Sequence, residues 1–98
     1  MVKEKEQICI NAVSKILCDN YGIDYFSVNG PKECAACMEE SVDGWMVYCV
    51  ERGNRFDVKR HYNVVDACVD LITRLGINDN LKDLIEQFYS SIIGEHVA

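Results

Sequence analysis

Apolar residues recur at helical spacing over residues 4–21, near the start of the chain. Side chains three and four positions apart share one face of an α-helix, so this spacing predicts an amphipathic helix that packs on a core. Gly22 follows directly, and glycine readily takes the left-handed conformation in which helices often end. The expected core face consists of Ile8, Cys9, Ala12, Val13, Ile16 and Leu17.

The period changes to two over residues 23–62, which indicates β-strands whose side chains point alternately to opposite faces. Turn residues divide this part of the chain, most clearly at positions 29–31 and 42–44. Connections this short cannot form a parallel crossover, so we expect neighbouring strands to be antiparallel. The predicted strands, at 23–28, 32–40, 45–51 and 55–61, then form a four-stranded meander.

Helical spacing returns after residue 62. A second helix is predicted over residues 64–75, with Asn63 as its N-cap. A third helix is predicted from residue 81 to about residue 93, after the potential capping residues Asn78, Asp79 and Asn80. The expected order is α-β-β-β-β-α-α, a single α+β domain over residues 1–98 with helices packed on at least one face of an antiparallel sheet.

The predicted strand over residues 45–51 is apolar on both faces. Met46, Tyr48 and Val50 would point one way, and Trp45, Val47 and Cys49 the other. Two interpretations are open, because either helices cover both sides of the sheet or one side receives a partner. In the second interpretation Trp45 is a binding anchor, since tryptophan is enriched where interfaces concentrate their binding energy.

The next predicted strand, over residues 55–61, alternates without interruption. Phe56, Val58 and Tyr62 are expected on one face, and Arg55, Asp57, Lys59 and His61 on the other. We expect Arg55 or Lys59 to pair with Glu39 or Glu51 on neighbouring strands.

Length and composition restrict the class of protein. The chain has 98 residues, 49% of them hydrophobic, and its apolar runs are only a few residues long, which excludes a disordered or membrane-spanning chain. The first residues carry charges of both signs and no apolar stretch, so no signal peptide is predicted. The six cysteines, most of them at apolar positions, are then expected to be reduced thiols of a cytoplasmic protein.

The net charge is −6, and it is distributed unevenly. Residues 33–51 contain acidic residues but no Lys or Arg, namely Glu33, Glu39, Glu40, Asp43 and Glu51. The stretch that follows is basic, with Arg52, Arg55, Lys59 and Arg60. An acidic protein of this kind repels nucleic acid and anionic lipid and favours a basic protein partner.

The sequence offers little chemistry for catalysis. Cys34 and Cys37 form a C-x-x-C pair, but a structural zinc site needs four ligands and a redox pair needs a helix N-terminus. We therefore interpret both as strand cysteines. His61 is expected as a solvated strand-end residue, and Glu39 and Glu40 are adjacent in a strand and so face opposite ways. We predict no enzyme activity and no cofactor or metal.

One segment resembles a known class of proteins. The pattern W-x-V-Y-x-x-E-R-G runs from Trp45 to Gly53, and a predicted helix containing Asp66-Ala67-Cys68 follows it. This arrangement resembles small immunity proteins of bacterial polymorphic toxin systems, and the resemblance covers residues 23–75. Such proteins are encoded beside a toxin and neutralise it by tight binding. The resemblance implies a cytoplasmic bacterial inhibitor without a cofactor, and it carries over no fixed set of functional residues.

These observations lead to a hypothesis about function. We predict an immunity-type inhibitor that binds a cognate toxin through an acidic sheet surface, whose carboxylates pair with the basic groups that a nuclease uses for phosphates. The predicted contact residues are Glu33, Glu39, Glu40, Asp43, Trp45 and Glu51. The alternative is a small-ligand or regulatory module that acts as a homodimer through the apolar sheet face.

Overall fold

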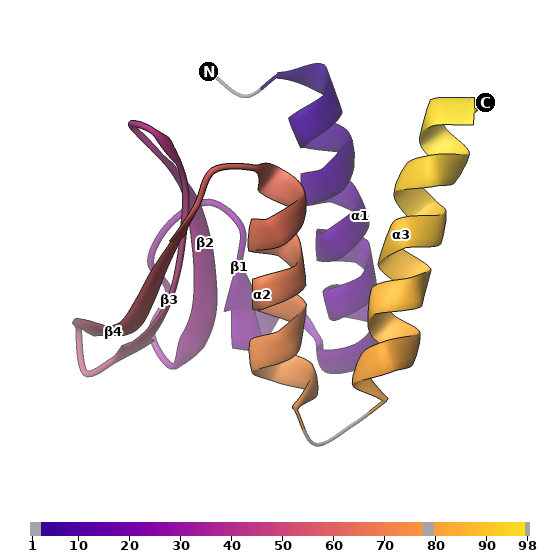
Figure 1. Ribbon diagram of the computed structural model, residues 1–98. Coiled ribbons are helices and arrows are strands. Elements are labelled where there is room, and N and C mark those ends of the chain that lie inside the picture. Colours follow the sequence, from indigo (N-terminus) through magenta and orange to yellow (C-terminus); the bar gives the residue numbers. More distant parts are fainter. Residues whose placement is uncertain (1–2, 78–79, 98) are drawn as a thin grey trace.

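The computed structural model describes residues 3–77 and 80–97, with side chains described as far as Gly94. These residues form three α-helices, a short 3₁₀ helix and one four-stranded sheet, which confirms the α+β class and the predicted order of helices and sheet (Figure 1). The elements are α1 (Glu4–Tyr21), η1 (Ile23–Tyr25), β1 (Phe26–Ser27), β2 (Ala35–Ser41), β3 (Gly44–Glu51), β4 (Asn54–His61), α2 (Val64–Gly76) and α3 (Leu81–Val97).

Local hydrogen bonds explain where the helices begin and end. Gly22 ends α1 with a φ of 81°, and its backbone N–H donates to the Cys18 carbonyl at 2.9 Å. Asn63 is the N-cap of α2, as predicted, because its Oδ1 accepts from the backbone N–H of Asp66 at 2.9 Å. The predicted caps Asn78 and Asp79 lie outside the described residues.

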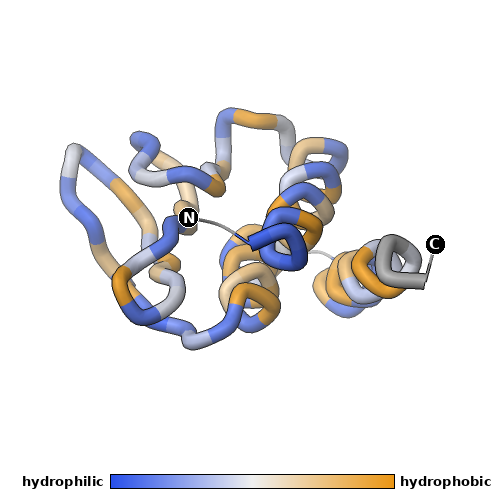
Figure 2. Tube along the Cα trace, turned by 90° about the horizontal axis from the view of Figure 1, so that it is seen from above, coloured by the Kyte–Doolittle hydropathy of each residue, from blue (hydrophilic) through white to orange (hydrophobic). Residues whose placement is uncertain are grey.

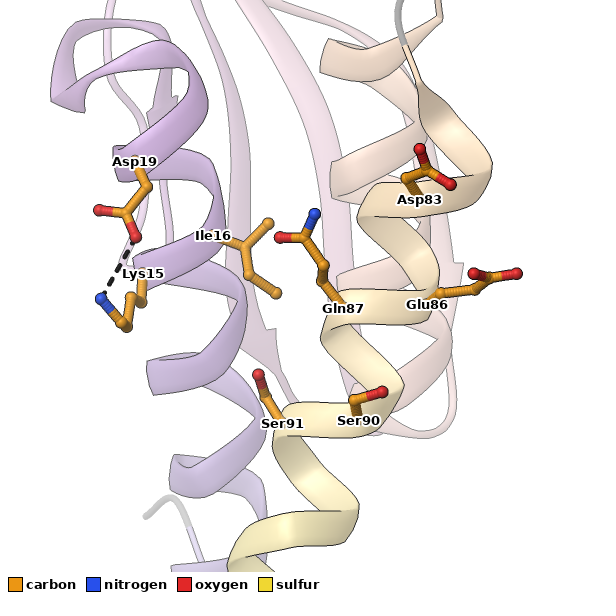
Figure 3. A pocket seen from close by; sticks show the side chains of 8 residues that line it. All are labelled: Lys15, Ile16, Asp19, Asp83, Glu86, Gln87, Ser90 and Ser91. Atoms are coloured by element: carbon orange, nitrogen blue, oxygen red, sulfur yellow. Dashed lines mark hydrogen bonds and ion pairs between the residues drawn. The ribbon is translucent and has the colours of Figure 1, made fainter.

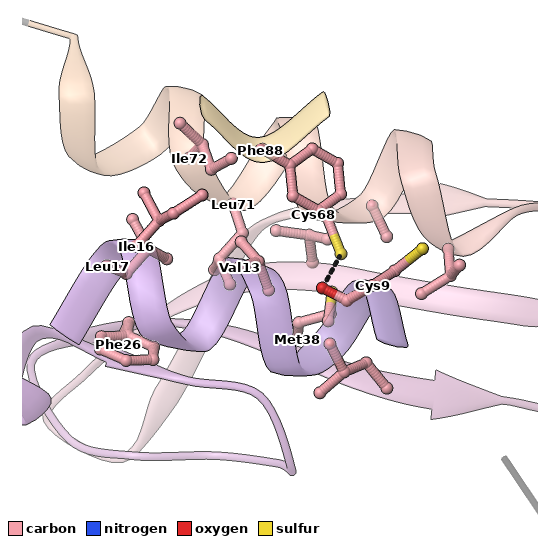
Figure 4. Packing of buried hydrophobic residues seen from close by; sticks show 14 of the residues in the cluster. Cys9, Val13, Ile16, Leu17, Phe26, Met38, Cys68, Leu71, Ile72 and Phe88 are labelled. Atoms are coloured by element: carbon pink, nitrogen blue, oxygen red, sulfur yellow. Dashed lines mark hydrogen bonds between the residues drawn. The ribbon is translucent and has the colours of Figure 1, made fainter. Parts of the chain in front are cut away.

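The helices and the sheet form layers. Viewed along the helices, α1 and α2 lie between the strands and α3 (Figure 2). Helix α2 packs on β2 and β3, and α3 packs on both α1 and α2. The core between these layers is apolar, and Figure 4 shows side chains from every layer meeting there. Among them are Val13 and Leu17 of α1, Leu71 and Ile72 of α2, Phe88 of α3, and Phe26 and Met38 of the sheet.

The sheet is mixed, so the prediction of a purely antiparallel meander is wrong for its first strand. The strand order is β1-β2-β3-β4, and β1 pairs with β2 in parallel, with Phe26 opposite Ala36. Residues 23–25, predicted as strand, form η1 instead. A short connection suffices here because β1 has only two residues, so residues 28–34 can turn back at Gly30 and re-enter in the same direction. The other two pairings, β2 with β3 and β3 with β4, are antiparallel as predicted.

The second face of β3 is covered by the chain itself. Trp45, Val47 and Cys49 face the helices, whereas Tyr48 and Val50 belong to a separate small cluster on the opposite face. Part of the connection between β1 and β2 lies near that face, where the Cys37 thiol is 3.6 Å from the Lys32 carbonyl oxygen. The interpretation that helices cover both sides of the sheet is therefore wrong, because among the described residues no helix packs on that face. The alternative, a partner on that face, stays a prediction, although Tyr48 and Val50 are already buried within the chain.

A β-bulge changes which residues of β4 share a face. Phe56 pairs with Cys49, but Lys59 pairs with Val47, so the register shifts by one residue between them. Asp57 takes up the extra length with a φ of 53°, in the left-handed region. The predicted alternation of β4 is therefore wrong, since Phe56 and Lys59 face the helix side while Val58 faces the other side.

Candidate functional site

Two of the acidic residues predicted to bind a partner stabilise the chain itself. The carboxylate of Glu39 accepts a hydrogen bond from the Tyr48 hydroxyl at 2.5 Å and pairs with Arg55 at 2.9 Å. The Arg55 guanidinium also lies 4.5 Å from the centre of the Tyr48 ring. Burial, together with the Glu39 carboxylate, raises the pKa of Tyr48. The predicted pairing of Arg55 with Glu39 is confirmed.

Glu33 has a similar internal role at the turn between β3 and β4. Its carboxylate accepts hydrogen bonds from the backbone N–H groups of Arg52 and Gly53, the latter at 3.0 Å. It thus anchors residues 28–34 to the turn between β3 and β4. Both oxygens of this carboxylate are engaged by the fold.

The remaining predicted contacts do not form one surface. Trp45 is only 2% exposed and lies in the main core, so the prediction that it is a surface anchor is wrong. Asp43 lies in the turn between β2 and β3, and Glu51 lies at the opposite end of β3. Glu40 is exposed and pairs in register with Trp45, which places it on the opposite face from Glu39. The acidic stretch of sequence is therefore dispersed over both faces and both ends of the sheet.

A polar network that the sequence did not reveal joins α2 to the β4 bulge. Arg74, whose side chain is 8% exposed, donates to the backbone oxygens of Asp57 at 2.6 Å and of Val47 at 3.3 Å. It also donates to Asp70 at 3.0 Å, and Asp70 lies 2.8 Å from Nε2 of His61. The network holds the unusual backbone of the bulge against α2.

The protonation state of this network follows from its geometry. Burial alone would raise the pKa of Asp70, but hydrogen bonds from Arg74 and His61 outweigh burial and lower it. Asp70 is therefore ionised at neutral pH and can only accept, so Nε2 of His61 must carry the proton that it donates. His61 is not the solvated strand-end residue that was expected.

A histidine held by a carboxylate also occurs in nucleophilic catalysis, where a nucleophile contacts the imidazole. Ser41 lines a hollow of about 130 Å³ together with His61, Asp43, Arg60 and Tyr62. Within the described part of the chain, however, the Ser41 hydroxyl makes no hydrogen bond to His61. The geometry of the pair supports a structural role, in which it fixes the end of β4 on α2.

The end of the sheet beside this hollow exposes two large side chains. Val42 is 99% exposed in the β2–β3 turn, and Tyr62 is 92% exposed in the connection from β4 to α2. The two loops are in close contact at Gly44, where a methyl group added to Cα would lie 2.3 Å from the His61 carbonyl oxygen and 3.1 Å from Cα of Tyr62. We call Val42, Asp43, Gly44 and Tyr62 the tip.

Tyr62 is not predicted as a contact residue, because the period of two continues to it from β4. A signal was nevertheless present, since Tyr62 directly precedes the helix cap Asn63 and so falls in a connection. Val42 lies in a predicted turn, where a side chain has little to pack against. Sequence reasoning thus located the acidic turn but not its aromatic neighbour.

Another hollow lies between α1 and α3. It measures about 580 Å³ and is open and polar (Figure 3). Lys15 pairs with Asp19 at 3.2 Å on its α1 side, whereas Glu86 of α3 points away from α1. Its charged side chains therefore do not converge as those of a small-molecule site do, although Gln87 and Ser91 point from α3 toward α1.

The C-x-x-C residues have different environments. Cys34 precedes β2 with a φ of 56° and is exposed, whereas Cys37 is buried within β2. Burial raises the pKa of the Cys37 thiol. The interpretation as strand cysteines is right for Cys37 and wrong for Cys34. Over residues 3–77 and 80–94, no three side chains of His, Cys, Asp or Glu are grouped as metal ligands.

Comparison of the chain with protein-family models, with curated proteins and with solved structures found no match. Among the described residues, no helix has both the length and the apolar character needed to cross a bilayer.

Proposed function

We propose that this chain binds a protein partner through the tip and acts as an immunity-type inhibitor of a toxin. The observation that carries the proposal is the exposure of Val42 and Tyr62 on two adjoining loops, next to the carboxylate of Asp43. Tyrosine is among the residues that most often dominate the binding energy of interfaces. A Tyr and a Val left in water by the fold would gain from burial against a partner.

The close packing of the tip supports this role. Gly44 lies against the backbone of residues 61–62, so the two loops are packed together as one unit. The hydrogen bond from His61 to Asp70 then holds that unit on α2. A preordered surface loses little conformational entropy when it binds, which favours tight association.

The charge of the tip suggests the chemistry of the partner. Asp43 is exposed there, and Glu40 lies near the end of the strand that leads into the same turn. Carboxylates beside an aromatic anchor suit a partner with a basic surface, such as the phosphate-binding groups of a nuclease toxin. Of the predicted contact residues, Asp43 and Glu40 remain in the proposal, and Tyr62 takes the place of Trp45 as the aromatic anchor. Glu33 and Glu39 are left out because their carboxylates are hydrogen bonded within the chain.

Charge reversal at the tip tests the proposal. The protein encoded by the adjacent gene is titrated calorimetrically with the wild-type chain and with Asp43→Lys, and we expect the variant to bind about tenfold more weakly or worse. The matched control is Asp83→Lys, because Asp83 is an exposed acid on α3, far along the chain from the tip. Equal affinity of Asp43→Lys and wild type, or an equal loss in the control, would refute binding through the tip.

A further inference from the structure

We propose that β4 binds an extended acidic segment of another protein as an additional strand of the sheet. This surface adjoins the tip at Arg60, but it lies along the edge of the sheet and goes beyond the function proposed above. The proposal rests on the free edge of β4, on unpaired positive charge along it, and on an apolar groove beside Phe56.

The edge strand is exposed along its length, and its backbone is engaged by a side chain at Asp57. In the described sheet β4 has one neighbour, β3, and residues 54–60 are all exposed. Side-chain hydrogen bonds reach this strand at Asp57, whose carbonyl oxygen accepts from Arg74. An edge strand presents unpaired backbone N–H and C=O groups, and an extended peptide can satisfy them by adding as a strand.

The charge of the edge selects the partner. Lys59 and Arg60 form no ion pair with any described residue, although Arg55 is paired with Glu39. Lysine on an edge normally prevents indiscriminate pairing, because like strands repel. Two copies of this chain joined through β4 would bring the same cations together, so charge argues against a homodimer and for an acidic strand.

The groove gives the added strand a place for an apolar side chain. It measures about 340 Å³ and is lined by Phe56, Tyr25, Cys49, Leu75 and Arg74, among others. Phe56 is 47% exposed and faces this helix side because it pairs with Cys49. In a strand added beside β4, alternate side chains point to the same side as Phe56, so one of them can pack on the Phe56 ring at the rim of the groove.

The bulge adds a constraint on register. Asp57 in its left-handed conformation interrupts the ladder, so an added strand meets two short pairing segments instead of one uniform edge. The interruption is fixed by Arg74, which contacts both the bulge and the groove. A partner strand must therefore carry its apolar and its acidic side chains at the spacing that separates the groove from Lys59 and Arg60. This requirement makes the edge selective.

The probe for this inference is a synthetic peptide, acetyl-Glu-Val-Glu-Phe-Glu-Val-Glu-amide, labelled for fluorescence anisotropy. Its glutamates share one strand face and its apolar residues the other. The glutamates can therefore lie on the Arg60 side of the sheet, and the apolar residues on the side of Phe56 and Lys59. We expect binding to the wild-type chain, with nuclear Overhauser contacts between the peptide backbone and β4. Arg60→Glu is expected to weaken binding about tenfold or more, and a peptide with Lys in place of Glu to prefer that variant.

Two control variants make the result decisive. Lys82→Glu reverses an exposed charge on α3, and Tyr62→Ala alters the tip; both should bind the peptide as the wild type does. Phe56→Ser should weaken binding through the groove with little change in charge. The inference is overturned if the peptide does not bind, if Arg60→Glu binds it unchanged, or if its contacts map to the tip or to the α1–α3 hollow. None of these outcomes alters the test of the tip, which uses Asp43.

Discussion

Two tyrosines define two contrasting regions of the molecule. Tyr48 lies in the middle of the sheet with 0% of its surface exposed, and its hydroxyl is bonded to Glu39. Tyr62 lies at the end of the same sheet with 92% of its surface exposed. The first region uses its charged groups to satisfy the fold, whereas the second leaves apolar and acidic groups in water.

The difference teaches that acidic residues in a sequence are not equally available to a partner. Glu33 and Glu39 both belong to the acidic stretch, yet the carboxylate of each is hydrogen bonded within the chain. If such a bond had to break for a partner to bind, a polar group would be left unsatisfied and the free energy gained on binding would be smaller. Asp43, in an exposed turn, carries no such penalty.

The largest expected effect on stability comes from the network of Arg74, Asp70 and His61, because the Arg74 side chain joins its parts. Arg74→Met removes the guanidinium that joins Asp70 to the bulge at Asp57, and we expect it to lower the free energy of unfolding by about 3–5 kcal/mol. Urea denaturation followed by circular dichroism measures this. Arg60→Met, at an exposed arginine on β4, should change stability by less than about 0.5 kcal/mol. Similar losses in the two variants would contradict the assigned role of Arg74.

A smaller effect, with a defined pH dependence, is expected for Asp70→Asn. The lowered pKa of Asp70 means that its ionised form stabilises the fold, by about 2–3 kcal/mol from two charge-assisted hydrogen bonds. That stability is present above the unfolded pKa, for which the ordinary value is 3.8, and is lost as pH falls through the lower folded pKa.

Denaturation curves at pH 7 and in steps below pH 4 test this expectation. The gap in stability between wild type and Asp70→Asn should be full at pH 7 and should close in the acid range. A gap that stays constant as the pH falls would show that the charge of Asp70 is not what stabilises the fold.

The smallest expected effect on stability is the difference between substitutions of the two tyrosines. Tyr48→Phe removes one buried hydrogen bond to Glu39 and should lower the free energy of unfolding by about 1 kcal/mol. Tyr62→Phe should leave stability unchanged within about 0.5 kcal/mol, since its side chain is almost fully exposed. Thermal unfolding of both variants under one set of conditions provides the comparison. A larger loss for Tyr62→Phe would mean that the tip supports the fold.

Local signals in the sequence were sufficient for much of the fold. Apolar spacing predicted α1 with the observed bounds, and Asn63 was recognised as the cap of α2. The hairpin of β2 and β3 was predicted around its Val42-Asp43-Gly44 turn. In each case the residues that determine the structure are near neighbours in sequence, so periodicity and turn chemistry reveal them.

Contacts between distant residues were what the sequence could not supply. Glu33 binds backbone groups of Arg52 and Gly53, well along the chain, and these bonds tie the segment before β2 to the β3–β4 turn. The bulge at Asp57 is fixed by Arg74 from another element. Without these contacts the sequence predicts a regular β4 and leaves a partner on one sheet face as an option, so it favours Trp45 over Tyr62 as the anchor.

The central claim, that the tip binds the partner, is tested most directly by mapping the complex by nuclear magnetic resonance. The ¹⁵N-labelled chain is titrated with the unlabelled protein encoded by the adjacent gene. The account predicts the largest amide shift changes at Val42, Asp43, Gly44 and Tyr62, and small changes around Glu33 and Glu39. Changes concentrated on the α1–α3 hollow, or on β2 around Glu39 with none at the tip, would contradict it.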